Sequence, residues 1–249
     1  MTPNAAASVP IETVTAFVGL DVCAYPKKPI KQQHGSMLLE SDDEFHAAFQ
    51  RLPTHVCVFA GSSDGASPEY MQAASTLGKL FAERNIALIY GGGSAGIMGK
   101  IAWEVQEHGG KVTGIIPDAL VHVSGEAIGQ QVVVKNMHER KRLMNRKCEA
   151  FVALAGGFGT MEELMEMITW SQLNIHGKPI IVLNTNDFYA PLRAWIEQAK
   201  EEQFISTTNA SIPVFVATPD EVISALEHYQ TPKRAYELIW HHHEQANLG

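Results

Sequence analysis

Short runs of apolar residues alternate with longer amphipathic segments along most of the chain. HVCVFA at 55–60 is the first such run, and a segment with Ser67 as a helix cap and Pro68 in the first turn follows it. Strands that are apolar throughout are typical of parallel sheets covered by helices on both faces. The pattern therefore predicts one Rossmann-like α/β domain, over residues 54–230, with a doubly wound parallel sheet. The predicted strands are 55–60, 86–90, 111–116, 132–134, 150–155, 179–183 and 214–217, and the predicted helices are 68–84, 97–105, 138–149, 161–173, 191–202 and 220–229.

The two ends of the chain lack this alternation. Residues 1–53 are rich in Ala, Pro, Lys and Gln and show no sustained period, which predicts a poorly ordered or loosely docked extension with a short helix over residues 42–51. Residues 231–249 are expected to form a C-terminal helix or tail. The three histidines at 241–243 could bind a metal weakly, but a frayed tail is the simpler interpretation, and we predict no metal site.

Composition and charge argue against several classes of protein. The chain has 249 residues and a formal net charge of −8, whereas a nucleic-acid-binding protein needs a basic surface to neutralise phosphates. No apolar stretch approaches the roughly 18–20 residues of a membrane-spanning helix, and no secretory signal is recognisable. The cysteines Cys23, Cys57 and Cys148 form no CxxC pair, which fits a reducing compartment and argues against a thiolate zinc site. We expect a cytoplasmic protein with neither nucleic-acid nor membrane partners.

A glycine-rich turn, GGGSAGIMG at 91–99, connects a predicted strand to a predicted helix. Gly91, Gly93 and Gly96 fit the GxGxxG fingerprint, whose glycines let a phosphate approach the backbone and the helix N-terminus. Asp118, after the next strand, stands near where a dinucleotide-binding protein has its ribose-binding acid. The turn, however, follows the second strand rather than the first, and a tight packing turn without a ligand is the alternative.

A second glycine-rich turn, GGFGTMEE at 156–163, also joins a strand to a helix. Its backbone amides can form an anion-binding nest, to which Thr160 adds a hydroxyl donor. Thr160 and Glu163 also fit a capping box, in which Thr160 is the N-cap and Glu163 bonds back to its amide. Two turns of this kind in one chain are more specific for phosphate binding than either is alone.

A cluster of cations follows the fourth predicted strand. MHERKR at 137–142, together with Arg146 and Lys147, brings five cations into eight residues of an acidic chain. Such a cluster either binds an anion or forms a solvated basic helix face. It is not an HExxH metal motif, because Arg142 stands where the second histidine would be. Three tryptophans are expected to pack as ordinary helix residues: Trp103, Trp195 and Trp240.

Taken together, these strings resemble the LONELY GUY (LOG) family of cytokinin-activating phosphoribohydrolases, long mislabelled as lysine decarboxylases. The matching stretches are CVFAGSS, IYGGGSAGIMG, GIIPDAL, NMHERK, FVALAGGFGTMEEL and ITWSQLNIHGKPI, in family order across residues 55–230. The pairing of MHERK with GGxGTxxE is the most specific part of the resemblance. Three places depart from the family: Ala155 replaces a usual proline, Phe158 stands where Tyr or Gly is common, and residues 121–123 lack a glutamate that often helps to hold the nucleotide.

The resemblance implies hydrolysis of an N6-modified adenosine 5′-monophosphate, or of AMP itself, to free base and ribose 5-phosphate, with no cofactor. It assigns the phosphate to the GGxGT turn and makes Arg140 and Glu163 the essential pair. It also implies a homodimer or larger homo-oligomer, with active sites close to the subunit interface. The resemblance and the two glycine turns give these substrate-binding candidates: Ser62, Gly92, Gly93, Gly96, Lys141, Gly156, Gly157, Phe158, Gly159, Thr160, Met161, Glu162 and Thr169.

Cleavage of an N-glycosidic bond develops positive charge on the ribose and negative charge on the departing base. We hypothesise that Glu163 stabilises the ribosyl cation and orients or deprotonates water, while Arg140 holds the phosphate side and fixes Glu163 by a charge-assisted hydrogen bond. A nucleotide-binding protein without turnover would use the same turns, and an NAD-dependent oxidoreductase would use the first turn and Asp118. A pyridoxal-phosphate decarboxylase has no supporting lysine context. The sequence leaves open whether the substrate is a prenylated cytokinin nucleotide, AMP or another monophosphate.

Overall fold

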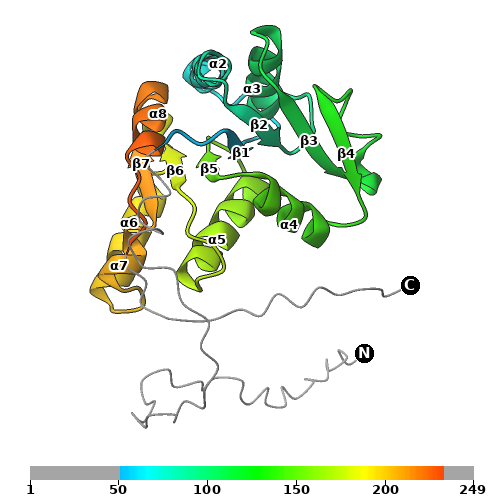
Figure 1. Cartoon of the computed structure of the whole chain (residues 1–249). Helices are drawn as coiled ribbons and strands as arrows, with labels where there is room; N and C mark the ends of the chain where they lie inside the picture. Colours follow the sequence, from blue (N-terminus) through cyan, green and yellow to red (C-terminus); the bar gives the residue numbers. More distant parts are fainter. Residues whose placement is uncertain (1–50, 233–249) are drawn as a thin grey trace, which may run out of the picture. The chain divides into compact units, whose positions relative to one another are not determined.

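Seven parallel strands form one sheet in the order β4-β3-β2-β1-β5-β6-β7 in the computed structural model, which describes residues 51–232 (Figure 1). The strands are β1 (His55–Phe59), β2 (Ala87–Tyr90), β3 (Val112–Pro117), β4 (Gln130–Val134), β5 (Ala150–Ala153), β6 (Ile180–Leu183) and β7 (Pro213–Val216). The helices are α2 (Pro68–Glu83), α3 (Gly96–Glu107), α4 (Met137–Lys147), α5 (Phe158–Gln172), α6 (Ala190–Glu201), α7 (Thr207–Ala210) and α8 (Pro219–Glu227), with short 3₁₀ turns η1 (Asp118–Leu120) and η2 (Thr185–Asp187). The predicted extension at 1–53 and tail at 231–249 lie outside the described residues, except for residues 51–53 and 231–232.

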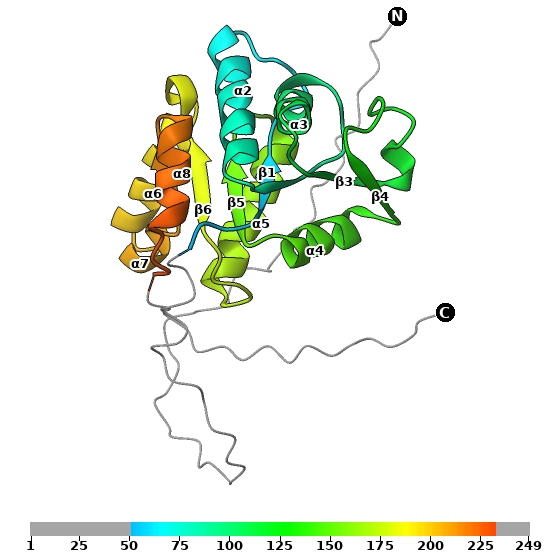
Figure 2. The ribbon, with the colours of Figure 1, turned by 45° about the horizontal axis from the view of Figure 1, so that its top comes forward.

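Helices cover both faces of the sheet, and Figure 2 shows α2, α3 and α8 together on one of them. On that face Leu77, Ile101 and Leu226 are buried in one apolar cluster with the strands. On the other face α4 and α5 bury Met144 and Leu164. The central strands are thus covered on both sides, which is why β2, β5 and β6 consist of apolar and aromatic residues alone. The predicted doubly wound α/β fold is confirmed. No helix within residues 51–232 is long and apolar enough to cross a bilayer.

The strand order reverses at the centre of the sheet, between β1 and β5. The chain adds β2, β3 and β4 outward on one side of β1, then crosses back and adds β5, β6 and β7 on the other side. Doubly wound sheets bind their ligands at the carboxyl edge where the order reverses. The loops after β1 and β5 meet at this edge, since Gly61 donates its amide to the carbonyl oxygen of Ala155 at 3.0 Å. Ser62 therefore lies on the loop next to the turn that begins at Gly156.

The predicted helices and strands are found within a few residues of their expected ends, but some side chains lie elsewhere than predicted. Trp103 and Trp195 are 48% and 49% exposed, so the prediction that they pack as ordinary helix residues is wrong, because their faces of α3 and α6 point to solvent. Trp240 lies outside the described residues. Ser67 is the N-cap residue of α2, yet its hydroxyl donates to the Glu69 carboxylate and caps no backbone amide.

Gly96 lies where the start of α3 packs on the loop after β1, and it has a positive φ of 63°. A Cβ there would lie 2.3 Å from backbone atoms of Ser62 and Ser63. Gly96→Ala is therefore expected to lower the free energy of unfolding by about 2–5 kcal/mol, because overpacking adds to the cost of a left-handed residue. Gly109→Ala is the matched control: φ is 80°, but nothing lies within 4 Å of the added Cβ. Chemical denaturation should give Gly109→Ala a loss of about 1–2 kcal/mol; equal losses in both variants would contradict the packing role.

Candidate active site

The start of α4 is fixed by its own polar residues. The Asn136 side chain accepts a hydrogen bond from the Glu139 amide at 2.9 Å, and the Glu139 carboxylate accepts one from the Lys135 amide at 2.9 Å. These reciprocal bonds satisfy donors at the helix start. Glu139 is thus a structural residue of the basic motif. The next two residues, Arg140 and Lys141, turn inward and are only 8% and 7% exposed.

The basic cluster therefore divides into two groups. Arg140 and Lys141 are buried against α5, which favours a functional role, whereas the remaining cations form the solvated helix face that was the alternative interpretation. The exposed cations of the cluster are Arg142, Arg146 and Lys147.

Arg140 is held by acceptors from three elements. Its Nε donates to the carbonyl oxygen of Ile115 in β3 at 2.9 Å, and its Nη2 donates to the carbonyl oxygen of Gly91 after β2 at 3.2 Å. Its Nη1 lies 3.0 Å from Oε1 of Glu163 in α5. A Cβ at Gly91 would lie 2.4 Å from Nη2, so a side chain there would displace the guanidinium from this position. The guanidinium is thereby fixed beneath the carboxyl ends of β2 and β3.

Glu163 is a buried carboxylate in a mixed electrostatic environment. Its side chain is 9% exposed. Burial raises its pKa above the ordinary value, the nearby Arg140 guanidinium opposes this rise, and the negative charge of Glu162 adds to it; the net effect is a raised pKa. A carboxylate of this kind is suited to proton transfer or to stabilising a cation at a water-poor site.

Lys141 forms a second ionic link between the same two helices. Its Nζ pairs with Glu162 and lies 3.0 Å from the Glu166 carboxylate, one turn farther along α5. Burial by itself would lower the pKa of Lys141, but the hydrogen bonds and charges of these two carboxylates outweigh it and raise the pKa. Arg140 and Lys141, adjacent in α4, thus form ion pairs with three carboxylates of α5. These ion pairs fix the alignment of Arg140 with Glu163.

The second glycine turn is open at the start of α5. The helix begins at Phe158, with Gly157 as its N-cap residue in an extended conformation. Gly157, Phe158 and Gly159 are exposed, with Phe158 exposed to 98%. Within residues 51–232 the amides of the first three helical residues, 158–160, donate to no protein acceptor. Free amides at a helix N-terminus form a binding site for an anion.

The predicted capping box of Thr160 and Glu163 is wrong. Thr160 lies inside the first turn of α5 rather than at the N-cap, and its buried side chain packs on Gly156. A Cβ at Gly156 would lie 2.2 Å from the Thr160 hydroxyl oxygen, so glycine is required there. Glu163 pairs with Arg140 instead of returning to the backbone. Helix α5, preceded by Gly156 and Gly157, begins at Phe158, three residues before the predicted start at residue 161.

The first glycine turn is closed by contrast. The Met98 amide donates to the Gly61 carbonyl oxygen at 3.0 Å, the Ile97 amide to the Ser63 carbonyl oxygen at 3.4 Å, and the Ser94 amide to the Ser124 carbonyl oxygen at 3.1 Å. These three amides are therefore engaged within the protein and are not free for a pyrophosphate. The geometry favours the packing-turn alternative over the NAD alternative. It gives two of the predicted substrate-binding glycines, Gly92 and Gly96, a role in packing, whereas a Cβ at Gly93 would make only ordinary contacts.

Other predicted residues lie at different distances from the ion pair. Ser62 is exposed on the loop after β1, at the switch point of the sheet. Met161 is half-buried and packs in the apolar cluster beneath α5. Thr169 is exposed, and its hydroxyl donates to the Met165 carbonyl oxygen at 2.8 Å. It lies six residues, or about 9 Å of helix, beyond Glu163. The structure therefore does not bring Thr169 to the open turn.

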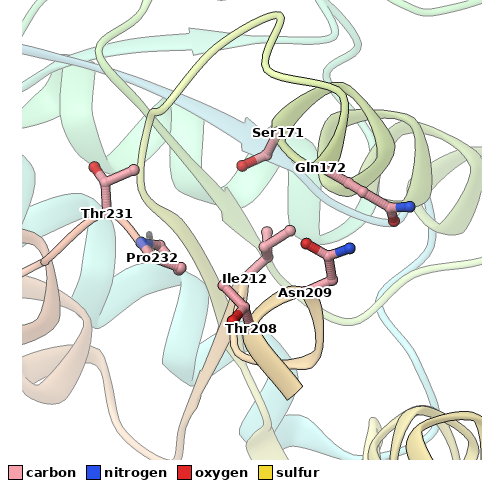
Figure 3. A pocket seen from close by; sticks show the side chains of 7 residues that line it. All are labelled: Ser171, Gln172, Thr208, Asn209, Ile212, Thr231 and Pro232. Carbon is pink, nitrogen blue, oxygen red and sulfur yellow. The ribbon is translucent and has the colours of Figure 1, made fainter. Parts of the chain in front are cut away.

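Two hollows lie near these helices. One, of about 500 Å³, runs along α4 and α5 and is lined by Lys135, Asn136, His138, Glu139, Lys141, Arg142, Glu166 and Trp170. The other, between the end of α5 and α7 (Figure 3), has a volume of about 10 Å³, room for about one water molecule. Within residues 51–232 no group of three or more His, Cys, Asp or Glu side chains is arranged to hold a metal.

Several contacts of the ion pair are not visible in the sequence motifs. The carbonyl oxygens of Gly91 and Ile115 carry no side-chain signal, because any residue supplies such an oxygen. The thioether of Met137, 3.9 Å from Nη1 of Arg140, is likewise not predicted. Glu166 could have been found, since Glu162 and Glu166 stand four residues apart on one helix face opposite a lysine.

Comparison with known proteins relates the chain to a defined family. The family described as "Possible lysine decarboxylase" matches residues 98–226. The chain is 45% identical over 205 residues to a protein named probable cytokinin riboside 5′-monophosphate phosphoribohydrolase LOGL2 from Oryza sativa subsp. japonica, covering 81% of this chain and 84% of that protein. It is 43% identical to the Arabidopsis thaliana phosphoribohydrolase LOG2, covering 80% and 93% of the two chains.

Solved structures share the fold at lower identity. The molybdenum cofactor carrier protein of Chlamydomonas reinhardtii is 22% identical with a TM-score of 0.52, over 71% of this chain and 97% of that one. The molybdenum cofactor binding protein of Rippkaea orientalis gives the same identity and TM-score, over 71% and 96%. These similarities support the Rossmann-like fold.

Arg140→Met leaves Glu163 buried without its partner, so the free energy of unfolding at neutral pH is expected to fall by about 3–5 kcal/mol. The double variant Arg140→Met/Glu163→Gln removes the unpaired charge and should recover about 1–3 kcal/mol of this loss. Arg142→Met, next along α4 but exposed, is the control and should change stability by less than about 0.5 kcal/mol. Urea denaturation of the four proteins measures this; an Arg140→Met protein as stable as Arg142→Met would show that the buried pair contributes nothing.

Proposed function

The chain belongs to the LOG family of cytokinin riboside 5′-monophosphate phosphoribohydrolases, and we propose that it hydrolyses the N-glycosidic bond of an N6-modified adenosine 5′-monophosphate, or of AMP, to the free base and ribose 5-phosphate. The observation that carries the proposal is the buried Arg140–Glu163 ion pair in α4 and α5, together with the open turn at which α5 begins. Relatives named for this activity at 43–46% identity support the substrate class.

The N-terminus of α5 is suited to the 5′-phosphate. The amides of residues 158–160 point out of the first turn, and the helix dipole places partial positive charge there. Five residues, about 7.5 Å of helix, separate Phe158 from Glu163. A phosphate bound at the helix start and a carboxylate about one and a half turns later are spaced for the ribose phosphate of a single nucleotide.

Glu163 is proposed to act on the ribose. In its ionised form the carboxylate stabilises the positive charge that develops at the anomeric carbon and orients or deprotonates the attacking water. Its burial strengthens this interaction, because little water screens it. The raised pKa also keeps the carboxylate basic enough to accept a proton from water.

Arg140 is proposed to keep Glu163 ionised and oriented. Of its five N–H groups, two donate to main-chain carbonyl oxygens, one faces Glu163 and one faces the Met137 sulfur. At most one N–H remains for a ligand. These contacts support a role at the carboxylate more strongly than the role at the phosphate that the sequence suggests, and the amides of α5 supply the phosphate site instead.

We further propose a homodimer or larger homo-oligomer in the cytoplasm. The resemblance to a typically dimeric family supports the first. The buried free thiols of Cys57 and Cys148 support the second, since reduced cysteines are typical of reducing compartments. Light scattering of the purified protein and imaging of a fluorescent fusion test the two points.

Glu163→Gln removes the proposed base and cation-stabilising charge while keeping the side chain's size, so kcat/KM for base release is expected to fall by about 10²–10⁴. Arg140→Ala should cause a loss of similar size. Chromatography of free base from AMP, isopentenyl-AMP and other nucleoside monophosphates measures the rates and ranks the substrates. Glu107→Gln, an exposed change at the end of α3, is the control. Nucleotide-dependent thermal stabilisation without any base release would instead favour a binding protein without turnover.

The acid limb of the pH profile should report Glu163. The carboxylate acts when ionised, so kcat/KM is expected to fall as the pH drops through a pKa that lies above 4.5. Glu162→Gln removes a charge that raises this pKa and should move the limb to lower pH, whereas ionisation of the substrate phosphate, near pKa ~6, stays unchanged. The free energy of unfolding should change with pH in the opposite direction to the activity. The folded protein binds the Glu163 proton more tightly than the unfolded chain does, so protonation of Glu163 stabilises the fold, and this contribution is lost as the pH rises through the raised pKa. Rates of both proteins from about pH 4 to 8 test the assignment; coincident acid limbs would contradict it.

A further inference from the structure

A methionine sulfur lies against the guanidinium of Arg140. Sδ of Met137 is 3.9 Å from Nη1, the same nitrogen that lies 3.0 Å from Glu163. A thioether is a weak hydrogen-bond acceptor. Nε and Nη2 of Arg140 donate to carbonyl oxygens, which are strong acceptors. The Met137 contact is therefore the weakest part of an otherwise tightly held side chain.

Met137 is also exposed. It is the first residue of α4 and is 39% exposed, whereas the guanidinium that it touches is buried. The other methionines of residues 51–232 are at least partly buried. Met144, two turns farther along the same helix, is 1% exposed. Solvent and small oxidants can thus reach the side chain of Met137, whose sulfur contacts the ion pair.

We propose that Met137 is an oxidation site through which hydroperoxides switch off the catalytic pair, an inference that rests on the proposed function. The sulfur attacks one oxygen of the peroxide and the O–O bond breaks. One oxygen remains on sulfur as the sulfoxide, and the other leaves as water or an alcohol after a proton transfer. The sulfur loses two electrons and the peroxide gains them. A thiol-dependent methionine sulfoxide reductase reverses the step, with release of water and formation of a disulfide.

The sulfoxide changes the balance of forces at Nη1. Its oxygen is a far stronger acceptor than the thioether sulfur, and the sulfur that carries it faces Nη1, whereas Nε and Nη2 donate to main-chain carbonyl oxygens. Nη1 carries one hydrogen for each of these neighbours, so a stronger acceptor on the Met137 side draws the guanidinium toward itself and away from Glu163. The carboxylate then loses part of its charge-assisted hydrogen bond, and its alignment with the ribose is lost.

The experiment treats the purified 249-residue chain with hydrogen peroxide and follows two peptides and the rate of base release. Trypsin cuts after Lys135 and Arg140 and after Arg142 and Arg146, so Met137 and Met144 fall in separate short peptides. Met137 should gain one oxygen well before the buried Met144. The rate should fall by about tenfold or more, in proportion to oxidised Met137, and return after treatment with the reductase.

Two substitutions separate this mechanism from general damage. Met137→Leu keeps the side chain's bulk without an oxidisable sulfur and should hold its own starting rate under peroxide. Met137→Gln, which carries a permanent amide oxygen, should be slow before any treatment. Inactivation of Met137→Leu at the wild-type rate, or full activity of wild-type protein with Met137 oxidised, would overturn the proposal. Absence of base release from untreated protein would instead overturn the proposed function, and the order of oxidation of Met137 and Met144 would still be measured.

Discussion

A buried ion pair is stable only if its neighbours replace the water that it has lost. Arg140 and Glu163 meet this condition because β3 and the turn after β2 offer two carbonyl oxygens to the guanidinium. This requirement explains features that are far apart in the sequence. Gly91 leaves room for Nη2, and the ion pairs of Lys141 with Glu162 and Glu166 align α4 with α5. The geometry of the site thus follows from the contacts that α5, β3 and the turn after β2 make with the Arg140 guanidinium of α4.

The two glycine turns look alike in sequence but differ in what their amides do. At the start of α3 the amides are used by carbonyl oxygens of the loop after β1 and by Ser124, and a Cβ at Gly96 would collide with that loop. At the start of α5 the first amides face solvent, and a Cβ at Gly157 or Gly159 would meet nothing within 4 Å. One turn holds the fold together and the other is free for a ligand. A glycine pattern alone cannot distinguish these uses, because it records only the absence of side chains.

Much of the fold could be predicted because it depends on repeated, local signals. Continuous apolar runs and helical spacing give the order and type of the elements, since the central strands of a covered parallel sheet are buried on both faces. The pairing of Arg140 with Glu163 was also accessible through the motif resemblance. The start of α5 was not, because Thr160 and Glu163 satisfy a local capping rule that a tertiary ion pair overrides. The exposure of Trp103 was missed for a related reason: helical spacing identifies a face, but it does not identify what covers that face.

The crossover that α4 makes has a geometric consequence. It carries the chain from edge strand β4 to central strand β5, four strand spacings away, or about 19 Å at 4.8 Å each. Its 11 residues span about 16 Å, nearly this width. The distance between β4 and β5 thus sets the length of the helix that bears Arg140. Loss or gain of a single residue between the start of α4 and Arg140 would rotate the guanidinium by about 100°, so exposed positions such as Arg142 should tolerate exchange of their side chains far better than the helix tolerates a change of length.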